Sequence, residues 1–84
     1  MKQSYITFRS VTYAQKAERI LKKSGMECVI QRTPKELSHR GCGYCLGMPP
    51  GQIAQAAQIL NHEKVEYGKL YATGIDGSYE EIRL

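Results

Sequence analysis

The sequence predicts one small α+β domain in which two helices cover one face of an antiparallel β-sheet. Two stretches with apolar residues at helical spacing, 13–21 and 53–60, alternate with short segments rich in β-branched and aromatic residues. The chain has 84 residues, enough for one domain and too few for two. A chain of this size buries only about 60–65% of its surface on folding, so a deep cleft between lobes is not expected. Any chemistry should therefore lie on an edge or a loop.

The first third of the chain predicts a strand, a helix and a second strand. Residues 4–8 alternate in bulk, as a half-buried strand does. Thr12 and Gln15 have the spacing of a capping box at a helix start, and Gly25 suits a left-handed residue at the helix end. Residues 26–31 then predict the second strand.

A loop and a third strand follow. Residues 33–40 are polar and connect the strands, with one helical turn expected at 34–37. Residues 41–48 begin as a glycine-rich loop and continue as a strand.

The last third predicts a second helix and a hairpin. Pro50 suits the first turn of that helix, which should end near Asn61. Residues 69–73 and 79–83 flank an Asp-Gly turn and predict two paired strands. The resulting order is the βαββαβ pattern of a ferredoxin-like sandwich, a single domain over residues 1–84 with a C-terminal hairpin extension. Its sheet face away from the helices could hold a second copy of the chain, so a homodimer is expected.

Composition limits the location and the chemistry. The longest apolar runs are a few residues, and the first residues lack the apolar stretch of a signal peptide, so a cytoplasmic protein without a membrane segment is predicted. Three cysteines are a poor disulfide framework in that reducing compartment. No phosphate-binding loop, paired carboxylates or Ser/His/Asp arrangement is present in the sequence, which sets aside nucleotide hydrolysis and glycosidase chemistry.

Positive charge gathers in the half of the chain that holds every cysteine. Residues 1–48 carry nine Lys and Arg against three Glu, a net charge of +6, whereas residues 49–84 sum to −2. Residues 32–40 bring three of these cations closest to the cysteines, and we expect this basic surface to dock an acidic patch on a partner.

The segment with evident chemistry is Cys42-x-x-Cys45. A thiolate is the reactive form of cysteine, and a free thiol needs nearby positive charge or amide dipoles to ionise at neutral pH. His39 and Arg40 precede the first cysteine, and Gly41 and Gly43 flank it, which leaves backbone amides free to turn towards a sulfur anion. We therefore expect Cys42 to be exposed and activated.

Other uses of these residues remain open. The two cysteines could be bland surface or core thiols, or a redox pair, although a thioredoxin-type pair opens a helix and this one leads into a strand. A metal site could draw on His39, Cys42, Cys45 and Cys28, but Cys28 lies in a predicted strand and is most simply a core residue.

The same residues also admit a different function, the binding of nucleic acid. Residues 40–44 approximate the basic-Gly-aromatic-Gly-aromatic motif of RNA-recognition motifs, with Cys42 in place of the first aromatic. Tyr44, with Tyr5 or Phe8 on the first strand, could then form a stacking platform. A total net charge of +4 is modest for a phosphate binder, so nucleic acid is the less favoured partner.

The sequence resembles the family of small bacterial selenium/sulfur carrier-like proteins. The resemblance runs through Thr7-Phe8-x-Ser10, Ala14-x-x-x-Glu18-x-x-Leu21, Gly25, Thr33-Pro34 and above all Ser38-x-x-x-Cys42-Gly43, with a similar ending at Tyr79-Glu80-Glu81-Ile82.

The resemblance implies a covalent carrier more than a stand-alone enzyme. The family's cysteine falls on Cys42, which would hold sulfur or selenium as a persulfide or selenenylsulfide, with no permanently bound cofactor. A cysteine desulfurase-like donor and a sulfur- or selenium-accepting enzyme would be its partners. Cys45 lies outside the family pattern and could act as a resolving thiol that releases the cargo, and Ser38 would belong to the binding loop.

Overall fold

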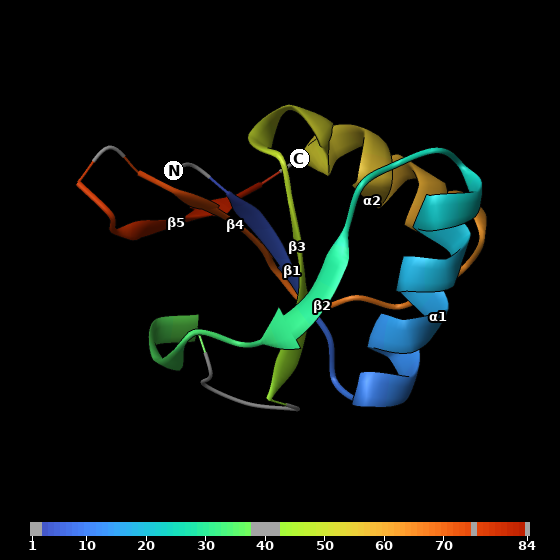
Figure 1. The fold of residues 1–84 in the computed structure, drawn as a ribbon, viewed down its shortest axis with the longest axis horizontal. Helices are drawn as coiled ribbons and strands as arrows, with labels where there is room; N and C mark the ends of the chain where they lie inside the picture. The colour runs from blue at the N-terminus through green and yellow to red at the C-terminus, as the bar shows by residue number, and fades with distance from the viewer. Residues whose placement is uncertain (1–2, 38–42, 75, 84) are drawn as a thin grey trace.

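The computed structural model describes residues 3–37, 43–74 and 76–83, which form two α-helices and one five-stranded sheet (Figure 1). The helices are α1 (Val11–Lys23) and α2 (Ile53–His62). The strands are β1 (Ser4–Thr7), β2 (Val29–Arg32), β3 (Tyr44–Met48), β4 (Leu70–Thr73) and β5 (Tyr79–Ile82). Two 3-10 helices, η1 (Lys35–Leu37) and η2 (Pro50–Gln52), complete the described elements.

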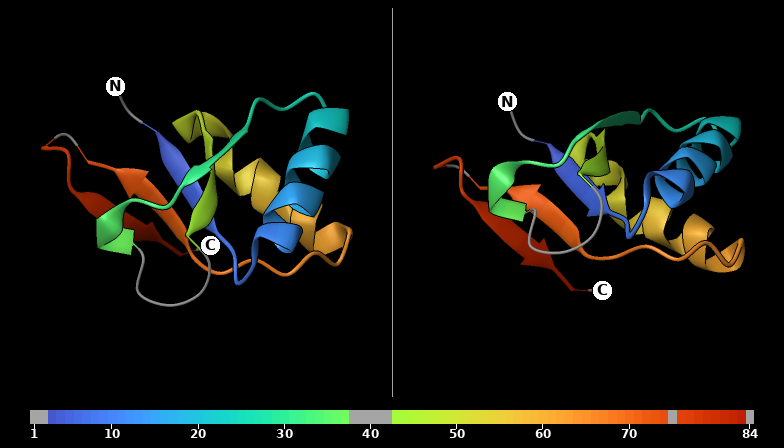
Figure 2. Two further views of the ribbon diagram at one scale, coloured as in Figure 1. Left: turned by 60° about the horizontal axis from the view of Figure 1, so that its bottom comes forward. Right: turned by 90° about the horizontal axis from the view of Figure 1, so that it is seen from below.

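The sheet has the order β2-β3-β1-β4-β5, and every neighbouring pair of strands is antiparallel. The first four strands follow the ferredoxin-like arrangement, and β5 adds a fifth strand beside β4. The α+β prediction is therefore confirmed, and so is the C-terminal hairpin. Figures 1 and 2 show this hairpin projecting from the sheet on the side away from the helices.

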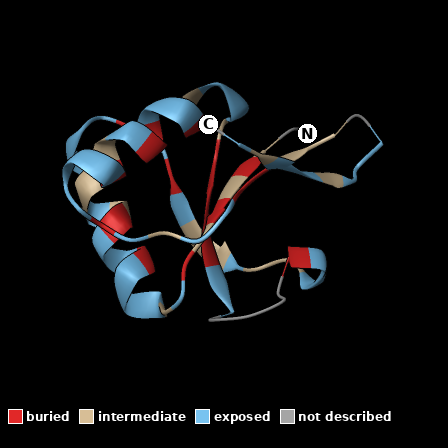
Figure 3. Ribbon diagram, turned by 180° about the vertical axis from the view of Figure 1, so that it is seen from behind, coloured by how far each residue is buried: buried red, intermediate tan, exposed pale blue. Residues whose placement is uncertain are grey.

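The main core lies between the sheet and the two helices. Ile6 of β1 stands opposite Leu46 of β3 and Leu70 of β4, so the three side chains share the face that the helices cover. Small residues bring the helices close to this face, namely Ala14 and Ala17 on α1 and Ala56 and Ala57 on α2. Figure 3 shows the buried residues on the inner sides of the helices and along the central strands.

The start of α1 differs from the capping box predicted at Thr12 and Gln15. The helix begins at Val11, and its N-cap is Ser10, whose extended backbone has φ −153° and whose hydroxyl accepts a hydrogen bond from the Tyr13 N–H at 3.5 Å. Thr12 is an exposed residue inside the first turn. The prediction was wrong by two residues because Ser10 can make the same hydrogen bond two positions earlier.

The end of α1 agrees with the prediction at Gly25. Its φ of +83° is left-handed, its N–H donates to the Lys22 carbonyl, and the Met26 N–H donates to the Leu21 carbonyl. This pair of bonds is a Schellman motif, which uses Met26 to close the helix. The sequence predicted that the second strand begins at residue 26. In the structure it begins at Val29.

The sheet face away from the helices is partly covered by η1, which Figure 2 shows on that side. The Leu37 N–H donates to the Pro34 carbonyl, so the helical turn predicted at 34–37 is present. Leu37 is buried although it lies outside the main core. The Tyr5 and Tyr79 rings meet edge to face at 5.8 Å on this same sheet face.

Hydrogen bonds hold residues 76–78 of the turn predicted between the two strands of the hairpin. The Asp76 carboxylate accepts hydrogen bonds from the Ser78 hydroxyl and N–H, which lower the pKa of Asp76, and Gly77 has a left-handed φ of +84°.

No helix in the described residues is long and apolar enough to cross a bilayer.

Candidate functional site

The structure describes two of the three cysteines, and both are buried. Cys28 is 4% exposed and Cys45 is 0% exposed. Five of the predicted site residues, Ser38, His39, Arg40, Gly41 and Cys42, lie outside the described residues. The two remaining site residues are described. Gly43 precedes β3, and Cys45 lies within that strand.

Cys28 is a core residue, as the sequence predicted. It belongs to the main core, and its thiol donates a weak hydrogen bond to the Glu18 carbonyl at 3.9 Å. Burial raises the pKa of Cys28 most, the Glu18 carboxylate raises it further, and Lys22 partly offsets both. Cys28 therefore stays a neutral thiol at physiological pH and is a poor nucleophile.

Cys45 lies inside β3, with its side chain on the sheet face opposite the helices. It stands opposite Thr7 of β1 and Gln31 of β2, whereas its neighbour Leu46 faces the core. Tyr71 of β4 is buried on the same face, and η1 lies on that side of the sheet. The pKa of Tyr79, on this same face, is raised mainly by burial and also by the charges of Tyr5, Glu36 and Cys45. Cys45 is therefore a covered strand residue and not part of an open loop.

Gly43 leaves free space next to Cys42 in the chain. It is exposed, and apart from its two chain neighbours no atom of the described residues lies within 4 Å of the position that a Cβ would take. Its carbonyl accepts a hydrogen bond from the Thr33 N–H at 2.8 Å, which extends the β2–β3 pairing by one step beyond Tyr44. The chain is thus anchored to β2 one residue after Cys42.

Two of the three cations expected to form one basic surface near the cysteines, Arg32 and Lys35, lie on two sides of the sheet. The Arg32 guanidinium lies over the Tyr44 ring, 5.8 Å from its centroid, and both side chains share the sheet face of Leu46. Lys35 belongs to η1 on the other side. Among the described residues of that stretch, these two cations therefore do not make a continuous patch.

The structure does not assemble the stacking platform of an RNA-recognition motif. Tyr5 pairs with Gly47 and shares the face of Cys45, so Tyr44 lies on the opposite face of the sheet from Tyr5. Phe8 is 2% exposed and belongs to the core. The aromatic residues that the RNA-binding alternative requires thus do not share one open surface.

A metal site that includes both Cys28 and Cys45 is excluded by the fold. Cys28 packs between the sheet and α1, whereas Cys45 lies on the other face of the sheet. Within residues 3–37, 43–74 and 76–83, no three His, Cys, Asp or Glu side chains are grouped as metal ligands.

The sequence of residues 3–72 matches the model of one protein family. Its description is "Putative Se/S carrier protein-like", and the match covers the two helices, β1 to β3 and all but the last residue of β4, including the Cys42-Gly43 pair. The chain belongs to this family. No curated protein and no solved structure matches this chain. Strand β5 lies beyond the matched residues, so the Se/S carrier-like part of the chain is the four-stranded ferredoxin-like unit.

One feature of this Se/S carrier-like protein was missed in the sequence. The exposed side of α1 forms an open hollow lined by Gln15, Glu18, Arg19, Lys22 and Lys23. The Glu18 carboxylate pairs with Lys22 at 3.4 Å and also accepts a hydrogen bond from the Ile30 N–H of β2 at 3.3 Å. The i,i+4 spacing of Glu18 and Lys22 predicts the ion pair. The bond to β2 could not be foreseen because it depends on how the helix lies against the sheet edge.

Proposed function

We propose that this protein carries sulfur or selenium on Cys42 between a donor enzyme and an acceptor enzyme. The observation that supports the proposal most is the family match, which spans residues 3–72 and includes Cys42. A small protein suits this task, because a carrier needs one accessible reactive atom and surfaces that larger enzymes can bind.

The burial of the other two cysteines supports the choice of Cys42. Cys28 is held in the core with a raised pKa, and Cys45 is 0% exposed in β3. Neither sulfur can meet a donor enzyme without a local rearrangement. The open space at Gly43 further supports the approach of a second macromolecule next to Cys42.

The loading step is a transfer of the outer sulfur of a persulfide. The Cys42 thiolate attacks that sulfur on the donor's cysteine, a new S–S bond forms on Cys42, and the donor's S–S bond breaks. The electron pair of that bond leaves with the donor's cysteine as a thiolate, while the proton stays on the transferred sulfur. Selenium follows the same path and gives a selenenylsulfide. His39, Arg40 and the amides of Gly41 and Gly43 would stabilise the attacking thiolate.

Cys45 is proposed as the thiol that releases the cargo. Its thiolate would attack the Cys42 sulfur, forming a Cys42–Cys45 disulfide and expelling hydrosulfide or hydroselenide. Two cellular thiols would then reduce the disulfide and become a disulfide themselves. Because Cys45 is fully buried opposite Thr7 and Gln31, this step requires the start of β3 to leave its pairing. Release should therefore be slower than loading.

Mass spectrometry after incubation with a cysteine desulfurase and cysteine tests the loading step. We expect wild type to gain the mass of sulfur, Cys45→Ala to gain it and keep it longer, and Cys42→Ala to gain nothing. Cys28→Ala is the matched control and should load as wild type does. An adduct that persists in Cys42→Ala would contradict the proposal.

A further inference from the structure

We propose that the exposed side of α1 is a docking surface for an acidic polypeptide segment. The surface consists of the residues that line the hollow on α1, which are Gln15, Glu18, Arg19, Lys22 and Lys23. The inference rests on the proposed function in one respect, since the segment would belong to the enzyme that exchanges sulfur with Cys42.

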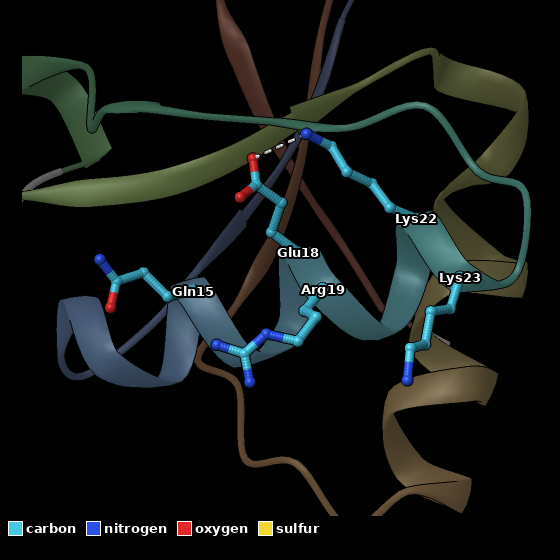
Figure 4. Close-up of a pocket in the computed structure, with 5 residues that line it drawn as sticks. All are labelled: Gln15, Glu18, Arg19, Lys22 and Lys23. Carbon is cyan, nitrogen blue, oxygen red and sulfur yellow. Dashed lines mark ion pairs between the residues drawn. The ribbon is translucent and has the colours of Figure 1, made fainter.

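The cations of the α1 surface are arranged on two sides of Glu18. Figure 4 shows Glu18 and Lys22 directed towards β2, where they form their ion pair, while Arg19 and Lys23 extend from the other side of the helix. Both Arg19 and Lys23 are exposed, and neither takes part in an ion pair within the described part of the chain. Two positive side chains are thus available to carboxylates of a partner.

The position of the α1 surface suits a partner that works on Cys42. Thr7, at the end of β1, pairs with Cys45 near the start of β3, and α1 begins four residues later at Val11. The helix therefore starts at the end of the sheet where β3 begins. It runs from there towards the opposite end of the sheet (Figure 1). A segment bound along α1 would hold a large enzyme next to that end while leaving Gly43 uncovered.

Strand addition is not the mode of binding at this surface. β2 is an edge strand, but its Ile30 N–H is already bonded to the Glu18 carboxylate at 3.3 Å. A partner strand would have to displace Glu18, which also pairs with Lys22. The structure therefore favours contact through side chains on α1.

An acidic polypeptide fits this surface better than a nucleic acid does. A polypeptide can space its carboxylates to meet Arg19 and Lys23 and can avoid Glu18. A nucleic-acid backbone carries a phosphate at every nucleotide and would bring negative charge close to that carboxylate. The hollow is also lined without any aromatic side chain on which a base could stack.

Binding of a fluorescently labelled poly-glutamate peptide to the intact protein tests the docking surface directly. Reversing two charges in Arg19→Glu/Lys23→Glu should weaken binding about tenfold, because each lost pair is replaced by a repulsion. The matched control is Lys64→Glu/Arg83→Glu, which changes the net charge equally at two positions outside α1 and should bind nearly as wild type does. Equal losses in both variants would overturn the proposal, as would tighter binding of single-stranded poly-uridine RNA that the first variant abolishes.

Sulfur transfer from a persulfide-loaded cysteine desulfurase provides the second readout. Arg19→Glu/Lys23→Glu should raise the donor concentration needed for half-maximal transfer, while alkylation of Cys42 by iodoacetamide stays as fast as in wild type. An unchanged half-maximal concentration would overturn the docking role. If Cys42 of wild type accepts no sulfur even from a small-molecule persulfide, the carrier function fails, and the peptide measurement still decides whether α1 binds acidic segments.

Discussion

Cys28 and Cys45 bury their sulfur atoms on opposite faces of one sheet. Cys28 faces α1, where its thiol donates to the Glu18 carbonyl, and burial and the charge of Glu18 both oppose its ionisation. Cys45 is buried on the other face of the sheet, which also holds Tyr71 and η1. A cysteine that is to exchange sulfur needs the opposite conditions, namely access and nearby positive charge.

The raised pKa of Cys28 predicts a loss of stability in alkali. The thiol has its ordinary pKa in the unfolded chain and a higher one in the folded protein. As the pH rises above about 9, the unfolded state ionises first and is favoured, and this continues up to the folded pKa. Urea unfolding between pH 8 and pH 11 should therefore show a steeper decline in the free energy of unfolding for wild type than for Cys28→Ala. Identical slopes would contradict this assignment. Some decline should remain in the variant because the pKa of Tyr79 is also raised.

The two ends of α1 show how single residues set the limits of an element. Ser10 supplies the first hydrogen bond of the helix, and Gly25 supplies the left-handed residue that ends it. Between them, buried Ala14, Ala17 and Leu21 hold one side of the helix on the sheet.

Removing the N-cap should destabilise the protein, whereas removing the residue that the sequence favoured should not. Ser10→Ala removes the acceptor for the Tyr13 N–H and should lower the free energy of unfolding by about 1 kcal/mol. Thr12→Ala is the matched control and should change it by less than about 0.5 kcal/mol, since Thr12 is exposed inside the first turn. Chemical denaturation measures both, and a larger loss in Thr12→Ala would show that the predicted capping box forms after all.

The left-handed backbone at Gly25 makes a second prediction for this helix. Gly25→Ala should cost about 1–2 kcal/mol, because an L-residue with φ near +83° is strained even where space is free. Gly51→Ala offers a control, since that glycine also has no atom within 4 Å of a Cβ but lacks a left-handed φ. Thermal unfolding should show a lower midpoint for the first variant only. Equal midpoints would mean that the chain relaxes at residue 25 without cost.

The limits of sequence prediction are visible in these same elements. The apolar spacing of 13–21 and 53–60 was enough to find both helices, and Gly25 and the Asp76-Gly77 turn were enough to place two chain reversals. The start of β2 was misplaced because Met26 is buried like a strand residue while its N–H still closes α1. Such boundaries depend on which of two competing hydrogen bonds forms. The spacing of apolar residues does not show which one it is.

At the scale of the whole molecule, the fold places the two described thiols, Cys28 and Cys45, on opposite faces of the sheet. Local sequence showed that Cys28 would be in the core, but it did not show that Cys45 would be covered on the other face. Cys45 faces the side of the sheet on which Tyr71 and η1, both distant in the sequence, also lie. For the same reason the α1 surface was not recognised, since Glu18 meets β2 only when the chain is folded.

Alkylation of the native protein should distinguish the three thiols. We expect iodoacetamide to modify Cys42 quickly, and Cys28 and Cys45 only after unfolding in urea, because buried sulfur is inaccessible. Peptide mapping by mass spectrometry measures each site. Cys42→Ser should remain almost unmodified under native conditions. Labelling of Cys45 as rapid as that of Cys42 would show that the cover over β3 opens freely.

The hydrogen bond between the Glu18 carboxylate and the Ile30 N–H also bears on the solubility of the chain. An edge strand with a free N–H and an exposed apolar side chain is a template on which other chains can pair and aggregate. β2 is an edge strand, and its Val29 is 59% exposed. By occupying the N–H of the next residue with a charged group, Glu18 acts as a gatekeeper against intermolecular β-pairing. A residue on a helix thus protects a strand that it contacts only in the folded protein.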